Sequence, residues 1–325
     1  MPRQQGFIQL PPIGKVLLFL LAIVYVAYLG AFGRFLYSAV TTPAQTVVVD
    51  TVNANAADTF NYWTTTSMSN ATIADQQDSS ASFSATSLDA SAGKGVQQQG
   101  QLPRDSSLSY PTSTVGKIFF SNASGQNMVC SGTAIASSNH NTVDTAGHCL
   151  YWQGSWVRNV IFCPLYNKGN TPYGCWAARD LEVPSDWMNR QQNDLHHDFG
   201  MIIVSPNDQG NLSDIVGGAG WAYNQAISQP FYAYGYPAAQ PFDGQTRQSC
   251  ENRTGKVWQH AGGTVVSIPC NMTGGSSGGP WFIQVNGNWY LNGHNDFTSS
   301  IQYGHMFSPY YDDTWYALYN KAQNS

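Results

Sequence analysis

The sequence predicts an all-β protein that ends in one helix. Charged residues make up only 10% of its 325 residues, and the turn-forming residues Gly, Ser, Asn and Thr are plentiful. From about residue 111, short apolar runs recur between turn signals, and a helical pattern occurs only near the C-terminus. Many short strands with few helices indicate a barrel or a sandwich. The apolar runs are Val115–Phe120, Met128–Ile135, Trp156–Phe162, Phe199–Val204, Phe231–Tyr236, Gly263–Ile268 and Trp281–Val285.

Two local patterns near the C-terminus predict a hairpin turn and the start of a helix. Asn286-Gly287 stands between two apolar runs, which is typical of a tight type I′ hairpin. Asp312 or Asp313 can cap a helix, because the apolar residues that follow fall on one helical face. These apolar residues are Trp315, Leu318 and Tyr319.

The first 40 residues are expected to be a signal peptide or an N-terminal membrane anchor. An uncharged stretch, residues 16–33, lies between Lys15 and Arg34, and no acidic residue precedes Asp50. Basic residues before an apolar run leave the N-terminus inside and export the rest. The stretch is long for a signal-peptide core and short for a span, and Ala31-Phe32-Gly33 offers a cleavage site. The remainder is expected outside the cytoplasm, secreted or anchored at the cell surface.

Residues 41–110 are expected to be a low-complexity pro-segment or a linker. The stretch Thr64–Ser109 consists mostly of Ser, Ala, Thr, Gln and Asp, without sustained apolar periodicity. Such a segment cannot bury a core of its own and is expected to stay loose. Residues 111–325 are then the globular domain.

The cysteines and the net charge limit the partners of this domain. Six cysteines form no Cys-x-x-Cys pair, so disulfides in an oxidising compartment are expected rather than a metal or redox site. A net charge of −5 is the wrong sign for a nucleic-acid binder. We expect a monomer that uses no metal and no cofactor, and that contacts a membrane only through its N-terminal segment.

A serine surrounded by glycines is the sharpest functional signal. Ser277 lies in Gly274-Gly275-Ser276-Ser277-Gly278-Gly279-Pro280, with apolar runs on both sides. Glycines allow a tight turn and the close approach of a substrate carbonyl. Two backbone amides can then converge on a developing oxyanion, and by position they belong to Gly275 and Ser277.

A serine nucleophile needs a base, and the base needs a carboxylate. Thr145-Ala146-Gly147-His148-Cys149 supplies a histidine that follows small residues. Asp198 directly precedes the apolar run Phe199–Val204, where a solvated surface charge is hard to explain. Asp194 is a rival, but the strand begins after Asp198. The predicted triad is therefore His148, Asp198 and Ser277.

These motifs, in the order His, Asp, Ser, resemble the trypsin/chymotrypsin superfamily of serine peptidases, and most nearly its bacterial secreted, V8-type glutamyl-endopeptidase branch. The resemblance covers about residues 111–325. It implies two six-stranded antiparallel β-barrels, with the site in the cleft between them. It also implies that Cys130 pairs with Cys149. The simplest remaining pairs are Cys163–Cys175 and Cys250–Cys270.

Two positions depart from the animal enzymes of this superfamily. Ser276 stands where they carry an Asp that binds a new N-terminal ammonium, so maturation is not expected to use that ion pair. Asn271 stands where trypsin has the acid that selects Lys or Arg, so a basic preference is not expected. Glutamate-selective relatives use a His on the strand that follows the nucleophile. The candidate pocket residues are therefore Asn271, Thr273 and His294, with an ordinary hydrogen-bonded histidine as the alternative for His294.

The expected function is hydrolysis of peptide bonds in proteins or peptides through an acyl-enzyme. Two alternatives remain open. One is a catalytically silent relative that binds proteins, and the other is an esterase with the same triad. Against the esterase, the α/β-hydrolase pattern places the nucleophile before the histidine, whereas here the histidine comes first.

Overall fold

The computed structural model describes residues 46–52, 55–73, 84–85, 97–190, 194–260, 263–300 and 302–325. The predicted signal peptide or anchor, residues 1–40, lies outside these ranges. Among the helices that the described ranges contain, none is both long enough and apolar enough to cross a bilayer.

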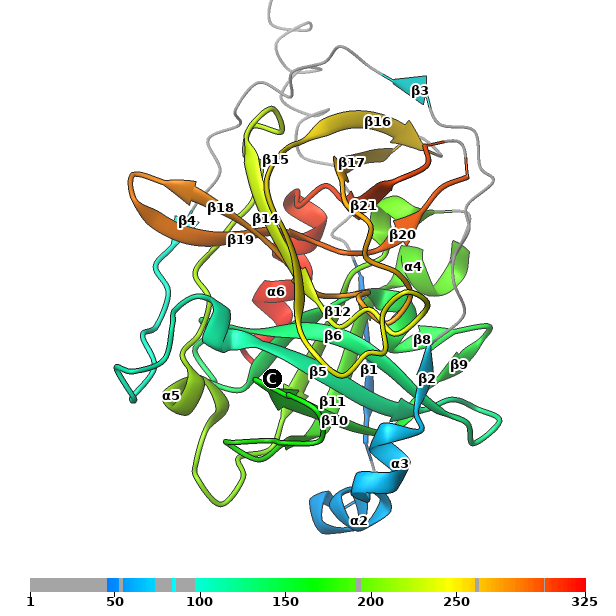
Figure 1. Ribbon diagram of the computed structural model, residues 1–325, viewed down its shortest axis with the longest axis vertical. Coiled ribbons are helices and arrows are strands. Elements are labelled where there is room, and N and C mark those ends of the chain that lie inside the picture. Colours follow the sequence, from blue (N-terminus) through cyan, green and yellow to red (C-terminus); the bar gives the residue numbers. More distant parts are fainter. Residues whose placement is uncertain are drawn as a thin grey trace, which may run out of the picture. The chain divides into compact units, whose positions relative to one another are not determined.

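The first half of the domain is a closed antiparallel barrel (Figure 1). β-Branched and aromatic residues, which suit a buried pleated surface, dominate its strands. Phe162, Trp176 and Ile202 are among the side chains buried in its interior. Its six strands follow one another around the barrel, and the last pairs back with the first: β5 (Val115–Ser121), β6 (Asn127–Ile135), β7 (Thr142–Thr145), β12 (Gly200–Val204), β11 (Trp176–Pro184) and β10 (Arg158–Pro164).

The second half consists of two sheets that enclose a second core around Trp281, Phe231 and Ile268. One sheet has the strand order β15 (Gln248–Thr254), β14 (Pro230–Gly235), β18 (Pro280–Val285), β19 (Asn288–His294), β13 (Trp221–Ala222) and β4 (Gln97–Gln98). The other has the order β20 (Phe297–Thr298), β21 (His305–Pro309), β17 (Gly263–Pro269), β16 (Lys256–His260) and β3 (Ser84–Ala85). The predicted all-β class is confirmed.

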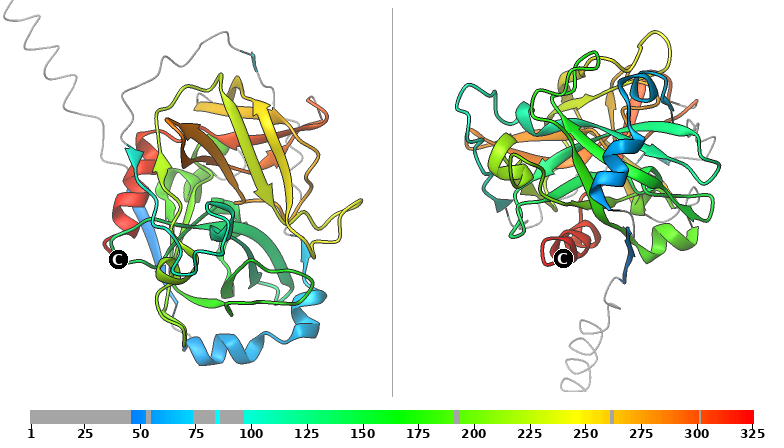
Figure 2. Two further views of the ribbon diagram at one scale, coloured as in Figure 1. Left: turned by 60° about the vertical axis from the view of Figure 1, so that its left-hand side comes forward. Right: turned by 90° about the horizontal axis from the view of Figure 1, so that it is seen from below.

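Both local patterns near the C-terminus are confirmed. Asn286 and Gly287 have φ of 51° and 80°, and they join β18 to β19 with Val285 opposite Asn288, as a type I′ turn requires. Asp312 caps α6 (Asp313–Ala322), because its side chain accepts from the amides of Thr314 and Trp315. The predicted apolar face of α6 is buried, and the helix lies beside β1 (Val47–Thr51) at the edge of the first barrel (Figure 2).

Described segments before and within the predicted loose stretch, Thr64–Ser109, pack on the first barrel. β1 adds to the edge of β11 over five residue pairs, and β2 (Thr72–Ile73) pairs in parallel with β6. Between them lie α2 (Ala56–Tyr62), α3 (Thr65–Ser69) and the buried Trp63, whose indole nitrogen donates to the main-chain O of Asn159. Main-chain pairing with a strand edge needs no apolar periodicity, so the sequence pattern did not reveal these contacts.

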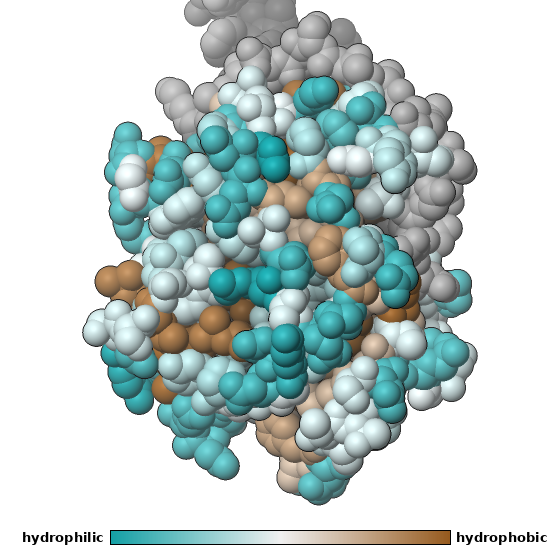
Figure 3. All heavy atoms as spheres, in the orientation of Figure 1, coloured by the Kyte–Doolittle hydropathy of each residue, from teal (hydrophilic) through white to brown (hydrophobic). Residues whose placement is uncertain are grey.

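The remaining elements are short connections. They are η1 (Thr112–Thr114), η2 (Gly147–Cys149), β8 (Tyr151–Trp152), β9 (Ser155–Trp156), α4 (Ser185–Arg190), η4 (Leu195–His197) and α5 (Leu212–Val216). On the face seen in Figure 3, hydrophilic and weakly polar residues predominate, and apolar residues form separate small areas. This surface agrees with a chain that is polar but carries little charge.

Candidate active site

His148 lies at the end of a short barrel strand, in a turn that requires a glycine. β7 ends at Thr145, and η2 follows almost at once. A Cβ atom on Gly147 would lie 2.8 Å from the main-chain O of Phe199 and 2.9 Å from Oδ1 of Asp198. A larger residue would therefore push the turn away from Asp198. The disulfide Cys130–Cys149 ties this turn to β6.

Strand pairing brings Asp198 to His148. β12 begins two residues after Asp198 and pairs with β7, so that Gly200 lies opposite Thr145. Segments that are 50 residues apart in sequence therefore meet at one edge of the barrel. The amide of His148 donates to Oδ1 of Asp198 at 2.7 Å, and Nδ1 of His148 is 2.9 Å from Oδ2. Both side chains are buried, so these bonds are shielded from water.

Ser277 is presented by the loop between β17 and β18, which lies against the first barrel. Its main-chain O accepts from the amide of Ser131 in β6 at 2.7 Å. A Cβ atom on Gly278 would lie 2.0 Å from Oγ1 of Thr145, and the φ of Gly278 is +79°, so only glycine fits there. Oγ of Ser277 donates to the main-chain O of Asp296 at 3.4 Å. The loop thus holds the serine directly beside the turn that carries His148.

The amides of the serine loop divide into bonded and unbonded ones. Those of Ser276, Gly278 and Gly279 donate to main-chain carbonyls at 3.2, 2.6 and 2.9 Å. Within the described part of the chain, the amides of Gly275 and Ser277 have no such acceptor. These are the two amides that the sequence assigns to an oxyanion hole, and they remain available to a ligand.

The loop is braced by its neighbours and by a buried lysine. Oγ of Ser276 donates to the main-chain O of Thr273, so this serine needs no ammonium partner. Thr273 is bonded through Oγ1 to the main chain of Ala239, on a neighbouring loop. Nζ of Lys117 reaches that second loop and donates to the main-chain O of Gly244 at 2.8 Å. Burial lowers the pKa of Lys117 to about 8, despite the opposing charge of Asp243.

Asp296 is the site residue that sequence reasoning missed. It follows β19, is only 4% exposed, and its Oδ1 lies 3.4 Å from Nδ1 of His148. The signal that could have found it is the same as for Asp198, namely an acid beside an apolar strand. A second carboxylate therefore shares the Nδ1 side of the imidazole with Asp198.

The three buried titratable groups shift one another. Burial alone would lower the pKa of His148, but the charge and hydrogen bond of Asp198, together with the nearby carboxyl of Asp296, raise it. Burial alone would raise the pKa of Asp198, but the charge and hydrogen bonds of His148 lower it. For Asp296, burial and then the charge of Asp198 raise the pKa well above its ordinary value. The pKa of Asp198 is thus lowered, whereas that of Asp296 is raised.

Asn271 and Thr273 line a cavity of about 570 Å³ beside the serine loop. Its other walls include Met272, Thr298 and His305, and none of the described residues that line it is Lys, Arg, Asp or Glu. Burial and the charge of Lys256 lower the pKa of His305, which keeps that ring neutral.

His294 does not line this cavity, in contrast to its expected place in the pocket. Its side chain is fully buried, with Nδ1 bonded to Oη of Tyr311 and Nε2 at 3.1 Å from the main-chain O of Asp198. It therefore supports the chain at Asp198 and is the hydrogen-bonded histidine of the alternative reading.

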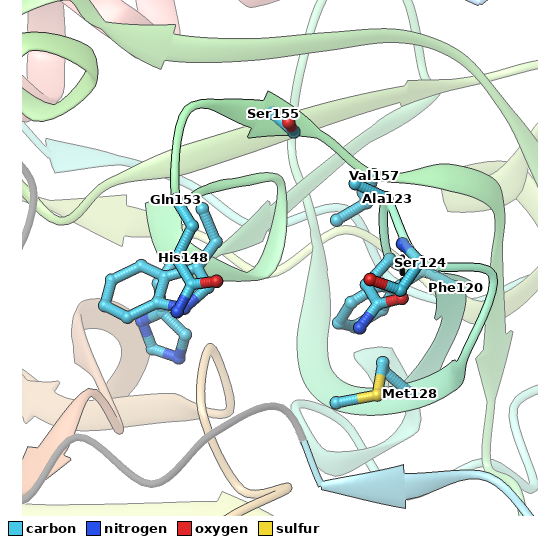
Figure 4. A pocket seen from close by; sticks show the side chains of 10 residues that line it. Phe120, Ala123, Ser124, Met128, His148, Gln153, Ser155 and Val157 are labelled. Carbon is cyan, nitrogen blue, oxygen red and sulfur yellow. Dashed lines mark hydrogen bonds between the residues drawn. The ribbon is translucent and has the colours of Figure 1, made fainter.

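A smaller cavity of about 120 Å³ opens beside His148, between the turn that joins β5 to β6 and the β8–β9 hairpin (Figure 4). His148 and Gln153 lie at one end, and Phe120, Ser124 and Met128 lie at the other. This cavity offers apolar surface next to the base, where one side of an extended ligand can rest.

Among the residues that the structure describes, two groups of side chains have the spacing of metal ligands. In the first, the ligand atoms of His148, Asp198 and Asp296 lie within 4.8 Å of one another. The second includes Cys130 and Cys149, which are joined in a disulfide and offer no thiolate. The other two disulfides are Cys163–Cys175 and Cys250–Cys270, so all three bonds have the expected pairing.

Curated relatives are bacterial peptidases of greater length. Glutamyl endopeptidase of Bacillus licheniformis is 28% identical over 165 residues, which cover 48% of this chain and 45% of that protein. A protein of Bacillus subtilis named extracellular metalloprotease is 26% identical over 135 residues, which cover 41% of this chain and 40% of that protein. The chain thus matches a little under half the length of these relatives. No family model matches it.

In two solved structures of similar proteins, the match to this chain covers nearly the whole length of the solved protein. A thermostable serine protease, AL20, from an extremophilic microorganism is 38% identical, with a TM-score of 0.60 over 66% of this chain and 98% of AL20. The protease Anisep from Arthrobacter nicotinovorans is 35% identical, with a TM-score of 0.59 over 70% of this chain and 99% of Anisep. Together with the barrel and the serine loop, these similarities show that the chain belongs to the V8-like branch of the trypsin-like serine peptidases.

Proposed function

We propose that this protein is an extracytoplasmic serine endopeptidase with the triad His148, Asp198 and Ser277. One observation carries the proposal. A fully buried carboxylate binds both the amide and the ring of His148, and in the neighbouring serine loop the amides of Gly275 and Ser277 have no main-chain acceptor among the described residues. Acyl transfer needs this combination of base, orienting acid, nucleophile and oxyanion donors.

In the proposed reaction, Oγ of Ser277 attacks a peptide carbonyl carbon while Nε2 of His148 accepts its proton. The hydroxyl now donates to the main-chain O of Asp296, and a rotation about its Cα–Cβ bond would turn it toward His148. Catalytic hydrogen bonds often tighten in this way only when substrate binds. Asp198 holds the Nδ1 proton and stabilises the imidazolium.

The amides of Gly275 and Ser277 would stabilise the oxyanion of the tetrahedral intermediate. His148 then returns its proton to the leaving amine, which leaves an acyl-enzyme on Ser277. Water attacks this ester with His148 again acting as base, and the second product departs.

The cavity beside the serine loop is the proposed primary substrate pocket. Its lining residues include Asn271, Thr273 and a neutral His305, and none of them carries a charge. The described pocket therefore offers neither the acid that selects Lys or Arg nor a permanent cation that would select Glu. We expect preference for an uncharged side chain.

Secretion or surface anchoring is also proposed. Three disulfides favour an oxidising compartment, and the relative from Bacillus subtilis is named as extracellular. The packing of β1 and α2 against the first barrel fits a pro-segment or tether that stays associated with the domain.

A fluorophosphonate probe tests the nucleophile. The purified protein should be labelled, and the Ser277→Ala variant should not, with or without a metal chelator. A wild-type protein that never reacts would instead be a silent relative. Activity that a chelator abolishes would contradict the serine mechanism.

Digestion of a peptide library, read by mass spectrometry, tests the reaction and the pocket together. We expect cuts after uncharged residues. Cuts after Lys or Arg would refute the role given to Asn271. Turnover of simple esters with no cleavage of peptides would indicate the esterase.

A further inference from the structure

Asp296 contacts both ends of the proposed catalytic apparatus. Its main-chain O accepts from Oγ of Ser277, and its Oδ1 lies 3.4 Å from Nδ1 of His148. The residue is 4% exposed, and its side chain is fully shielded from solvent. It has no place among the three residues that the sequence identifies.

The hydrogen bonds of the two acids are unequal. Both oxygens of Asp198 are occupied, Oδ1 by the amide of His148 and Oδ2 by its Nδ1. Neither carboxyl oxygen of Asp296 has a hydrogen-bond partner among the described residues. An ionised carboxylate without a hydrogen-bond donor is very costly to bury, and a second negative charge within 4.8 Å adds to the cost.

One proton removes both penalties. A protonated carboxyl carries no charge and gains an O–H donor. The carboxylate of Asp198 can accept this hydrogen bond, because its oxygen lies within 4.8 Å of that of Asp296 and hydrogen bonding from Asp296 contributes to the lowered pKa of Asp198. Two neighbouring carboxyls that share one proton are a known solution to the same problem.

We propose, on the basis of the proposed function, that Asp296 is a positioning residue that remains a neutral carboxylic acid and donates its O–H to Asp198. The network His148–Asp198–Asp296 then holds a single negative charge opposite the imidazole. The extra donor fixes the carboxylate of Asp198 and disperses its charge. His148 is thereby oriented for proton transfer without being locked as a cation.

The other titratable groups around Asp296 do not supply this proton. His294 precedes it on β19 and is bonded to Tyr311 and to the main chain of Asp198. Oη of Tyr311, which precedes α6, donates to Oδ2 of Asp144 at 2.7 Å. Burial and the charge of Asp144 raise the pKa of Tyr311, so this residue stays neutral. Neither His294 nor Tyr311 therefore donates a hydrogen bond to Asp296, and the proton lies on the carboxyl of Asp296 itself.

The rate at which a fluorophosphonate labels Ser277, measured across pH, tests the proposal. Asp296→Asn should lower the labelling rate only a few-fold, because its amide N–H can replace the O–H donor to Asp198. The acid limb of the pH profile should stay where it is in the wild type. Asp296→Ala should label about ten- to a hundredfold more slowly. Its acid limb should move to higher pH, because the undispersed charge of Asp198 then holds the proton on His148.

Two results would overturn the proposal. If Asp296 were an ionised counter-ion, Asp296→Asn would move the acid limb of the profile to lower pH by about one unit or more. If Asp296 had no role, Asp296→Ala would label like the wild type with the same profile. If Asp296→Ala merely folded poorly, labelling would slow without any shift of the acid limb, and Asp296→Asn would not restore the rate. That pattern also counts against the proposal.

Infrared spectroscopy provides a readout that does not depend on catalysis. The difference spectrum of wild type minus Asp296→Asn at neutral pH should contain the C=O stretch of a protonated carboxyl. Its absence would overturn the proposal. If the wild type failed to label at every pH, the proposed peptidase function would fail, and the infrared result would still decide the state of Asp296.

Discussion

Replacing Asp296 by Asn should make the folded protein more stable at neutral pH. The comparison is made in a Ser277→Ala background, which prevents self-digestion. Burial and the charge of Asp198 raise the pKa of Asp296 well above its ordinary value. At a pH between the ordinary and the raised pKa, Asp296 holds a proton in the native state that it has released in the unfolded chain. Stability in this interval therefore falls as pH rises, and the Asn variant escapes that loss.

The magnitude follows from the count of one proton. The free energy of unfolding of the parent should fall relative to that of the variant by about 1.4 kcal/mol per pH unit. The interval opens near the ordinary aspartate pKa of about 3.9, and the advantage of the variant grows with pH until the raised pKa of Asp296 is reached. Asn has nearly the same shape as Asp, so the change removes the titration with little change in packing.

Urea unfolding followed by tryptophan fluorescence, at several values between about pH 5 and about pH 8, measures this slope. Equal m-values for parent and variant would show that the same surface is exposed on unfolding. Parallel pH dependences in the two proteins would refute the reasoning, because they would mean that Asp296 loses its proton in the native state as readily as in the unfolded one.

Asp312→Asn is a matched control of opposite sign. Burial alone would raise the pKa of Asp312, but the hydrogen bond and charge of His196 and the helix amides lower it. Its ionised form thus stabilises the fold above the ordinary aspartate pKa, and this contribution is lost as pH falls through the lowered pKa. Asn caps helices well. The variant should be less stable than the parent near neutrality, and the difference should shrink in acid.

Three further predictions, one pH profile and two substitutions, test the site. The acid limb of kcat/KM should lie above the ordinary histidine pKa of about 6.5, because Asp198 raises that of His148; a lower limb in the pH–rate profile would contradict this. Lys117→Met leaves the main-chain O of Gly244 without its donor, so urea unfolding should show a loss of about 1–3 kcal/mol, and kcat/KM should fall; unchanged values would refute the brace. Asn271→Asp should create cleavage after Lys and Arg in a peptide library, and an unchanged cut pattern would remove Asn271 from the pocket.

Local chemistry was readable from the sequence where a few adjacent residues decide the outcome. Gly147 and Gly278 are required because a Cβ atom would collide with neighbouring main chain or side chains, and such glycines mark the turns in a motif. The cap at Asp312 and the turn at Asn286-Gly287 depend on backbone preferences of the same short range.

Register was not readable from the sequence, and His294 shows why. The β18–β19 pairing shifts register between Pro280 and Phe282, which is the mark of a bulge. A shift of one residue sends a side chain to the opposite face of a strand. The pattern therefore placed a histidine in the pocket, whereas the folded chain buries it behind Asp198 and brings Asp296 to the imidazole.

By itself the sequence determined the all-β class, the C-terminal helix and the residues that carry the proposed chemistry, because periodicity, caps and glycine turns act over a few residues. Only the tertiary structure decided the packing of β1 and Trp63 on the first barrel and the carboxyl pair of Asp198 and Asp296. Both arise from contacts between distant segments, and a buried charge has no energetic meaning until the fold has removed the water around it.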